Sequence, residues 1–353
     1  MQRRILLLIT CLSLWLLPSF SSSTSFVMMS DQVLLSQSDA VVAGTVTTVS
    51  SKTDGVLPLT LYSVSVSEWV KGGPGEETVI VQVPGGQAVN GKSLRIAGAP
   101  RFEPGSKVLL FLDQKRTGYY SLQQFLLGAF HRWIDSSGRE WAFRLLGDAI
   151  QVQPGTDQVA PGRDNLRDFN RFRSWLRQRL LGYQNEADYV PEPTEELQAL
   201  ETVLSEAKLM EASDGIPLRW FDFDSDTPVE WLALNSGQSG MTSGGFPEFE
   251  TALNLYSENP STKILYQYAG TTSSTSGINT ILWDDPNNEI GGSFSCSSGG
   301  TLAVGGPSFY SSTLQFNGES YHPIVQATII TQDGAGCFFG GNDGKDGEEV
   351  FAH

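Results

Sequence analysis

The sequence has little positive charge, few cysteines and few histidines. Its 353 residues include 23 Lys and Arg against 39 Asp and Glu, which gives a formal net charge of −16 at pH 7. A chain with this charge repels nucleic acid and anionic membrane surfaces at long range. We therefore expect no nucleic-acid partner and no membrane contact beyond an export signal. No Gly-x-Ser-x-Gly motif occurs, which argues against a serine hydrolase that carries its nucleophile on such a turn.

Glycine and short apolar runs, by contrast, are abundant. The chain holds 37 Gly, and 40% of its residues are hydrophobic. Short apolar runs between Gly-, Ser- and Thr-rich turns are typical of β-rich proteins, and the length suggests about two domains. We expect an α+β multidomain protein.

Residues 1–25 are predicted to be a secretory signal peptide. Arg3 and Arg4 form a basic start, and Ile5 to Leu17 is an apolar run that is short for a membrane span. Ser19 and Ser21 then offer a cleavage site. A retained membrane anchor is the alternative. We expect a secreted or extracytoplasmic protein, and the sequence does not indicate an oligomeric state.

Two cysteines follow the predicted signal, Cys296 and Cys337, in a setting that is expected to be oxidising. A disulfide between them is the simplest interpretation. On the chain-entropy estimate it stabilises the fold by roughly 3–4 kcal/mol. The alternatives are two buried thiols or a metal pair, although the cysteines lack the close C-x-x-C spacing of a structural zinc site.

Residues 27–155 are predicted to form a small antiparallel β-barrel that serves as a non-catalytic accessory module or prosegment. Short β-type runs separated by Gly- and Pro-rich turns indicate it, at 40–46, 61–70, 79–83 and 108–112. No helical periodicity is evident there. The order of the strands resembles an OB-like, netrin-type module, although the cysteines typical of netrin modules are missing. His131 is the module's lone histidine, and we expect it to be a packed or surface residue.

Residues 160–212 are predicted to be a helical linker. Apolar residues recur at helical spacing from Leu166 to Leu180, after the capping candidates Asp164 and Asn165, and a second helix is expected to begin at Thr194. The first helix is rich in arginine. This indicates either a solvated face or docking on an acidic partner, including the acidic C-terminal half of this chain.

The third region, residues 213–353, shows a definite order of elements. We expect a strand near 218–223, a helix at 246–258, strands at 264–268 and 278–283, an irregular segment with one further strand, and a final strand at 324–331. A helix should then begin near Glu348, capped by Asp346 or Gly347, because acidic residues suit the positive end of a helix. Val350 lies three residues before His353 on the same helical face.

This order resembles the N-terminal subdomain of the metzincin zinc proteases, specifically the matrixin-like branch, whose fold is a twisted mixed sheet with helices. The local match is Glu-Val-Phe-Ala-His at the end of the sequence. In the family the motif continues Glu-x-x-His-x-x-Gly-x-x-His. The resemblance implies a zinc-dependent metalloendopeptidase that acts on a protein or peptide substrate, with His353 as the first zinc ligand.

The resemblance also implies which parts of the catalytic motif are absent from this sequence. The general-base Glu and the other two zinc ligands would follow His353, so we expect the sequence to be cut off inside its catalytic motif and the chain to be inactive alone, with no catalytic residue of its own. His322 precedes Pro323 at the start of a strand and is expected to be structural.

Calcium is a further possible cofactor, because oxygen ligands cluster in the loop before the helix, at Asn342, Asp343, Asp346 and Glu348. The alternatives for this cluster are a loop and a helix cap. The alternative function is a complete, non-catalytic secreted β-rich binding protein.

Overall fold

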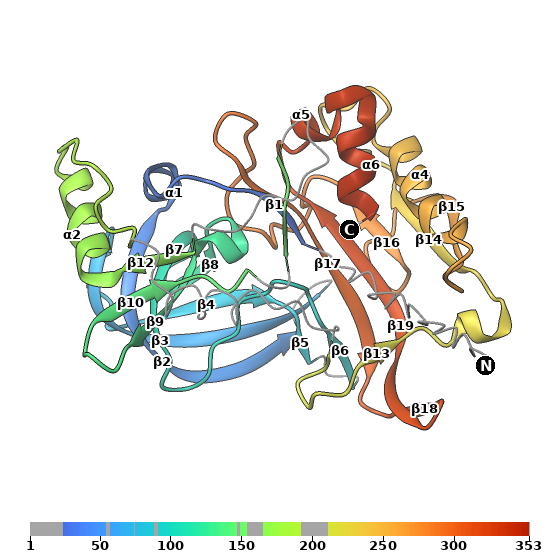
Figure 1. The fold of residues 1–353 in the computed structure, drawn as a ribbon, viewed down its shortest axis with the longest axis horizontal. Coiled ribbons are helices and arrows are strands. Elements are labelled where there is room, and N and C mark those ends of the chain that lie inside the picture. Colours follow the sequence, from blue (N-terminus) through green and yellow to red (C-terminus); the bar gives the residue numbers. More distant parts are fainter. Residues whose placement is uncertain are drawn as a thin grey trace, which may run out of the picture.

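The computed structural model describes residues 24–53, 57–73, 75–87, 91–146, 149–153, 165–191 and 211–352. It shows a β-rich α+β protein with a five-stranded closed β-barrel and a separate mixed sheet that carries few helices (Figure 1). The predicted signal up to residue 23, the helix expected from Thr194, and His353 lie outside the described residues. No helix within the described ranges is long and apolar enough to span a membrane.

The barrel closes in the order β7, β2, β3, β4, β8 and back to β7. Its strands are β2 (Ala40–Thr53), β3 (Pro58–Lys71), β4 (Thr78–Pro84), β7 (Lys107–Arg116) and β8 (Tyr119–Leu122). Neighbouring strands are antiparallel except β4 and β8, which run parallel. In β4, the buried residues Val79, Val81 and Val83 alternate with more exposed ones, the period of two that is expected of a strand with one face in a core. The predicted barrel is therefore confirmed as a closed five-stranded sheet.

Three more strands extend the barrel sheet beyond β7, namely β9 (Ala129–Ile134), β10 (Glu140–Phe143) and β12 (Leu166–Asp168). The 3-10 turn η1 (Phe125–Gly128) precedes β9. Helix α1 (Asp31–Gln37) lies in a region where no helical periodicity was evident. Seven residues are too few to show the period, but Ser30 caps this helix by accepting a hydrogen bond from the Val33 amide.

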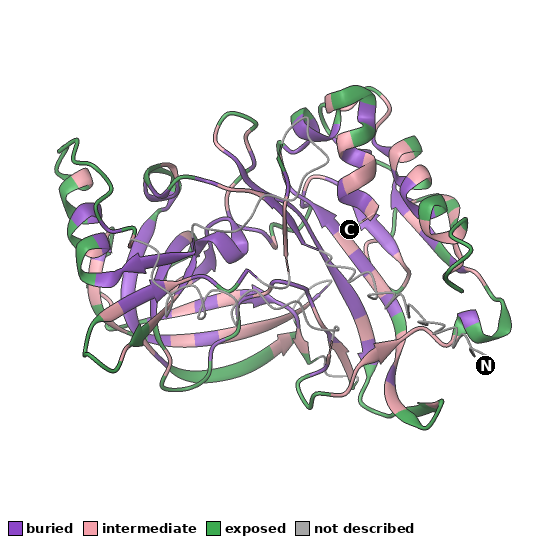
Figure 2. Ribbon diagram, in the orientation of Figure 1, coloured by how far each residue is buried: buried purple, intermediate pink, exposed green. Residues whose placement is uncertain are grey.

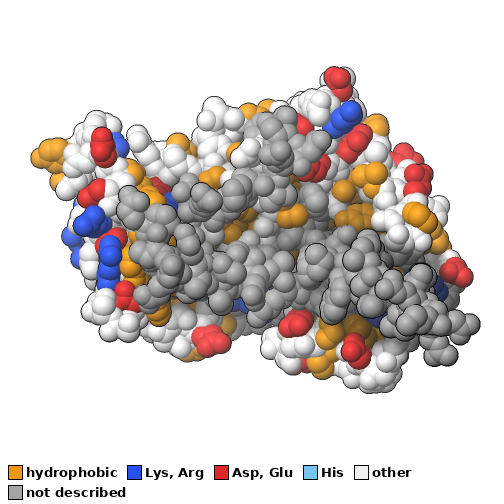
Figure 3. All heavy atoms as spheres, in the orientation of Figure 1, with side chains coloured by type: hydrophobic (Ala, Val, Ile, Leu, Met, Phe, Trp, Pro, Cys, Tyr) orange, Lys and Arg blue, Asp and Glu red, His pale blue; other side chains and the backbone are white. Residues whose placement is uncertain are grey.

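Helix α2 (Phe169–Leu180) is the first linker helix, but it begins later than predicted. Asp168 is the N-cap and accepts a hydrogen bond from the Arg171 amide, so the candidates Asp164 and Asn165 lie upstream of the true start. The apolar periodicity had included Leu166, which instead lies in β12. Arg173 and Arg177 pair with Glu68 of β3. Two arginines of α2 thus contact the barrel, and blue side chains are visible at the surface over this helix in Figure 3.

The mixed sheet contains a run of strands in the order β15, β14, β16, β19, β17. The first four run parallel to one another and β17 is antiparallel to β19. Their bounds are Val229–Leu234 (β14), Tyr266–Thr272 (β15), Thr280–Leu282 (β16), Gly300–Tyr310 (β17) and Glu319–Thr331 (β19). Two short strands, β13 (Leu218–Arg219) and β18 (Leu314–Phe316), add to β19. The strand expected at 218–223 is thus only two residues long, because the 3-10 turn η2 (Asp222–Ser225) follows it.

Helix α4 (Phe246–Ser257) covers this sheet beside the C-terminal helices (Figure 1). Its bounds confirm the predicted helix almost to the residue. Phe249 lies at the centre of its buried face. The centroid of its ring is 6.0 Å from that of Trp231 in β14 and 6.2 Å from that of Trp283, which follows β16. The regular spacing of Phe249, Ala252 and Leu253 explains why the sequence revealed this helix.

Segments from the N-terminal region join the two sheets along the outer edge of β17. Strand β1 (Ser25–Val27) pairs with the start of β17, and β6 (Lys92–Leu94) pairs with its end. Strand β5 (Gly86–Gln87) forms a hairpin with β6, and β11 (Ile150–Gln151) pairs with β1. Figure 2 shows β17 buried over most of its length. One hydrophobic cluster extends through both units.

A buried ionic network fixes α1 against the region around α2. The Asp31 carboxylate accepts hydrogen bonds from Arg144 at 3.0 Å, Arg167 at 2.8 Å and the Tyr189 hydroxyl at 2.9 Å. Burial alone would raise the pKa of Asp31, but the charges of Arg167 and Arg144 outweigh it and the pKa is lowered. The carboxylate is therefore held in its charged form at neutral pH.

Candidate functional site

The helix that the sequence predicted near Glu348 is present and lies on the mixed sheet. After β19 the chain forms α5 (Gly336–Phe339), the 3-10 turn η3 (Gly341–Gly344) and α6 (Lys345–Ala352). Helix α6 begins at Lys345, so Asp346 and Gly347 lie in its first turn and do not cap it. It contacts α4. The ring centroid of Phe351 lies 5.5 Å from that of Trp283 and 4.9 Å from that of Phe339.

The C-terminal end of α6 borders an apolar cavity of about 250 Å³ above the sheet. Val350, Phe351 and Ala352 line one side, while Gly306 and Pro307 of β17 line another. Val350 and Phe351 are themselves buried. The helix therefore ends close to the middle of β17, one residue before His353 in the sequence.

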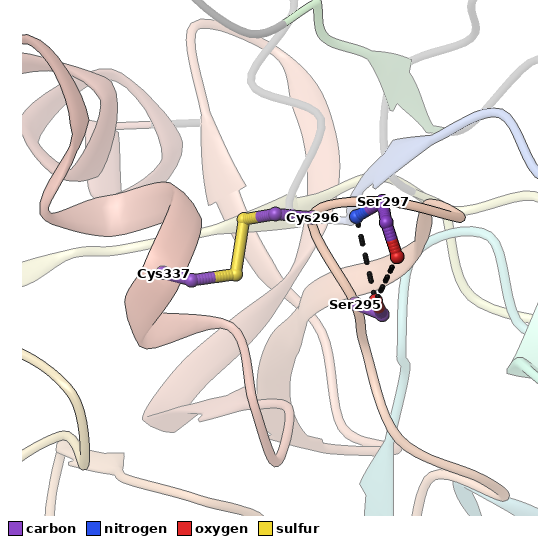
Figure 4. The surroundings of a disulfide bond; sticks show 4 residues. All are labelled: Ser295, Cys296, Ser297 and Cys337. Atoms are coloured by element: carbon purple, nitrogen blue, oxygen red, sulfur yellow. Dashed lines mark hydrogen bonds between the residues drawn. A yellow bond between two sulfur atoms is a disulfide. The ribbon is translucent and has the colours of Figure 1, made fainter.

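The predicted disulfide between Cys296 and Cys337 is present, with Cα atoms 6.3 Å apart (Figure 4). This separation lies in the normal range for a disulfide. Cys296 lies in the turn before β17, and Cys337 lies in α5. The bond therefore attaches the segment that leads into α6 to the segment that leads into β17.

The predicted metal ligands do not gather into a site among the described residues. His353 lies outside them, and no group of three or more His, Cys, Asp or Glu side chains within them is placed to hold a metal ion. Of the calcium candidates, Asn342 and Asp343 adopt left-handed backbone conformations in η3, whereas Asp346 and Glu348 lie in the first turn of α6. These four residues therefore form a tight turn and a helix start.

His322 is a structural residue, as the sequence predicted. Its Nδ1 lies 3.0 Å from the Ser312 carbonyl oxygen, and its Nε2 lies 3.0 Å from an Asp214 carboxylate oxygen. Both partners are oxygen atoms that accept hydrogen bonds. The histidine fastens the segment around Asp214 to the start of β19.

His131 packs between aromatic rings in the barrel. Its ring is stacked on the Phe143 ring with a centroid distance of 5.4 Å, and its centroid lies 4.9 Å from that of Phe102. Burial lowers the pKa of His131 to about 4, so the ring is neutral at physiological pH. This agrees with the expected packing role.

His131 and His322 also line a cleft of about 690 Å³ between the barrel and the end of the mixed sheet. Tyr62, Arg95 and Asp214 contribute polar groups to its wall. The two histidines and Asp214 are nevertheless committed to the contacts described above. The sequence did not indicate this cleft, because its walls come from segments far apart in the chain.

The buried acid Asp285 lies beside the half-buried acid Glu289, a pairing that the sequence did not predict. Asp285 accepts hydrogen bonds from the amides of Glu289 at 2.8 Å and Ile290 at 2.7 Å. Burial, and next the hydrogen bond and charge of Asp285, raise the pKa of Glu289 to about 8. The sequence signal was the run Asp-Asp-Pro-Asn-Asn-Glu, which reads as an ordinary polar turn. The pair lies in the loop that faces the barrel, where Gln123 bridges to Gly291.

Residues 86–93 match the spacing of a phosphate-binding loop, with Gly86, Gly91, Lys92 and Ser93 in the motif positions, a match that the sequence analysis overlooked. Such a loop needs a helix after its Ser so that the helix N-terminus faces the phosphates. Here Lys92 and Ser93 begin strand β6, and β5 precedes them. The described residues of this segment therefore pair as two antiparallel strands, and no helix follows Ser93 as a phosphate-binding loop requires.

No protein-family model matches the chain, and no curated protein sequence matches it significantly.

Proposed function

We propose that this protein is an exported, zinc-dependent metalloendopeptidase of the metzincin type, in which an OB-like accessory barrel precedes the catalytic region. One observation carries the proposal. The strand that precedes the Glu-Val-Phe-Ala-His motif leads through α5 into a helix, α6, whose apolar face is buried on a mixed sheet and whose end faces β17. The element order also supports the proposal, because β14, α4, β15, β16, β17 and β19 follow one another as the resemblance implies, with the short strands β13 before β14 and β18 before β19 as additions.

The five-stranded closure of the barrel supports the finer assignment to an OB-like module. Strands β2, β3, β4, β7 and β8 form a small closed sheet, and β9, β10 and β12 continue it on one side.

The described residues alone do not provide a zinc site, so the proposal depends on His353 and on residues that would follow it in the family pattern. Zinc bound there would supply an activated water for attack on a peptide carbonyl. The described residues of this chain hold helix α6 in position. Val350 and Phe351 anchor α6 to the sheet, and the disulfide at Cys337 fixes the approach to it.

The direct test is a chain extended past His353 in its natural reading frame, purified without added metal. We expect close to one zinc per molecule by elemental analysis and hydrolysis of a denatured protein substrate that stops when a chelator is added. The variant His353→Gln should lose both zinc and activity. As a matched control, His322→Gln changes a histidine that our assignment places outside the site and should keep the zinc. An extended chain that folds but binds no zinc refutes the proposal.

The alternative function, a non-catalytic binding protein, is favoured by the 690 Å³ cleft between the barrel and the mixed sheet. Its lining mixes apolar side chains such as Phe102 with polar ones such as Tyr62 and Arg95, as small-molecule and peptide sites commonly do. This alternative predicts ligand binding that is indifferent to chelators. Tyr62→Ala should weaken such binding, whereas His353→Gln should not.

A further inference from the structure

A second cleft, of about 390 Å³, lies between the barrel and the loop of residues 284–291, which connects β16 to β17. We call it the loop cleft. Side chains of β4, β7 and β8 form part of its barrel wall, and the loop forms the opposite wall. The two walls meet where Gln123, just after β8, pairs with Gly291. The loop cleft is therefore built from two segments that are far apart in the sequence.

Two buried polar atoms border the loop cleft without a protein partner. Ser121 of β8 is 4% exposed, and its hydroxyl oxygen is buried with no hydrogen-bond partner among the residues that the structure describes. Oε2 of Glu289 is also buried, and the described part of the chain offers it no partner either. Buried polar atoms in native proteins nearly always bind protein, water or a ligand. A molecule bound in the loop cleft satisfies both atoms.

The protonation of Glu289 determines what this molecule must offer. Burial, and next the hydrogen bond and charge of Asp285, raise the pKa of Glu289 to about 8, so its carboxyl is protonated at neutral pH. Two carboxyl groups that bond to each other share one proton, which leaves Oε2 of Glu289 as an acceptor. The Ser121 hydroxyl both donates and accepts. These two atoms therefore fit a ligand that carries hydroxyl groups.

Positive charge at the rim of the loop cleft determines the charge of the ligand. Lys115 Nζ lies 2.9 Å from the Asp113 carboxylate, and the Arg116 guanidinium lies 3.8 Å from the centroid of the Tyr119 ring. Lys52 of β2 is a third basic residue in the lining. Basic groups in this arrangement repel a cation and bind a carboxylate by charge-assisted hydrogen bonds. The ligand should therefore be an anion.

We propose that the loop cleft is a binding site for a small polyhydroxylated anion, the chemistry of a sugar acid. Hydroxyl groups of the ligand contact Glu289 Oε2 and Ser121, while its carboxylate lies against Lys115 and Arg116. The volume of about 390 Å³ lies within the range of small-molecule sites, roughly 300–1,000 Å³. This site goes beyond the proposed peptidase function and does not depend on zinc.

The first test is calorimetric titration of the full chain at pH 7 and constant ionic strength with glucuronate and galacturonate. Glucose lacks the charge of these probes, and acetate lacks their hydroxyl groups. At least one sugar acid should bind at least about tenfold more tightly than both controls. If neither does, the proposal is refuted. An oligomer of the acid that binds then distinguishes two sources, since tighter binding than the monomer indicates a polysaccharide and equal or weaker binding indicates the free acid.

The second test is Ser121→Ala. Because the Ser121 hydroxyl has no partner among the described residues, its removal breaks no hydrogen bond within them, and the urea midpoint should not fall. The affinity for the sugar acid should fall about fivefold. Ser67→Ala is the matched control, since its hydroxyl donates to the Ala43 carbonyl at 3.0 Å outside the loop cleft, and it should keep the affinity. An unchanged affinity in Ser121→Ala would exclude the proposed contact.

The third test is the pH dependence of binding. Ionised Glu289 repels an anion, so the affinity of the unmodified protein should fall about tenfold between pH 7 and pH 9, as the pH passes through its pKa of about 8. Glu289→Gln keeps a neutral acceptor oxygen, so it should bind as the unmodified protein does at pH 7 and lose no affinity by pH 9. The same pH dependence in both proteins would overturn the proposal. An affinity that rises with pH would also overturn it, because it would show a cation of the ligand beside ionised Glu289.

The comparison isolates Glu289 because the two proteins share every other charged group around the Glu289–Asp285 pair. Within the described residues these groups are Asp284 in the same loop, Asp333 after β19, Lys52 of β2, and Asp113, Lys115 and Arg116 of β7.

Discussion

The buried network around Asp31 allows a quantitative prediction of stability. Asp31→Asn keeps the shape of the side chain but removes the charge that Arg144 and Arg167 contact, and both guanidinium groups are almost fully buried. Breaking a buried ion pair by neutralising one partner costs about 3–5 kcal/mol, because the remaining charge is left without its counter-ion. We therefore expect the free energy of unfolding, measured by urea denaturation at pH 7, to fall by this amount.

The control is Asp113→Asn, the same chemical change in a partly exposed pair with Lys115. Such pairs contribute about 0–1 kcal/mol, so this variant should be close to the unmodified protein. The pH dependence gives a second check. Because the pKa of Asp31 is lowered in the folded state, its contribution is present above the ordinary carboxyl pKa and is lost as the pH falls through the folded value. Asp31→Asn should lack this acid-dependent part. A loss below about 1 kcal/mol at pH 7 would refute the assignment of a charged, paired carboxylate.

Three further predictions concern other groups. Replacing Cys296 and Cys337 by Ser should lower the free energy of unfolding by about 4 kcal/mol in non-reducing denaturation and have no effect in reducing denaturation, because the bond closes a loop of about 40 residues. The pKa of Glu289 is raised in the folded state, so the contribution of its protonated form to stability is fully present below the ordinary carboxyl pKa and is lost as the pH rises to about 8. Glu289→Gln should therefore make the melting temperature less dependent on pH over that range. An unchanged dependence of the melting temperature on pH would contradict the burial of this acid. The lowered pKa of His131 acts in the other direction, with stability lost as the pH falls from about 6.5 to about 4, and His131→Phe should reduce that loss.

Local patterns in the sequence predicted the elements whose signal is contained within a few residues. The helix at Phe246–Ser257 and the strand ending at Thr331 have strong periodicity or β propensity over their whole length. The disulfide was predicted from a count of two cysteines after the predicted signal peptide. The start of α2 was misplaced because Leu166 fits the helical spacing although it lies in a strand.

What the sequence did not show depends on contacts between distant segments. Nothing local in Ser25–Val27 or Lys92–Leu94 indicates that both pair with β17. The network around Asp31 likewise joins residues more than a hundred positions apart. The candidate active-site helix could be predicted, whereas the closed edge beside it could not, since an edge strand carries no mark of its partner.

The pairing of β1 with β17 also constrains how the protein reaches its native state. Ser25 lies opposite Ile150 of β11 on one side and Ala303 of β17 on the other, so β1 gains its second partner only after residue 303 has been made. Contacts of such high sequence separation form slowly, because the loop between the partners must close first. The barrel strands β2, β3 and β4 are near neighbours in sequence and can assemble early. We infer a folding order in which the barrel forms first and the mixed sheet waits for its last strands, which leaves one edge of β1 unpaired until β17 forms.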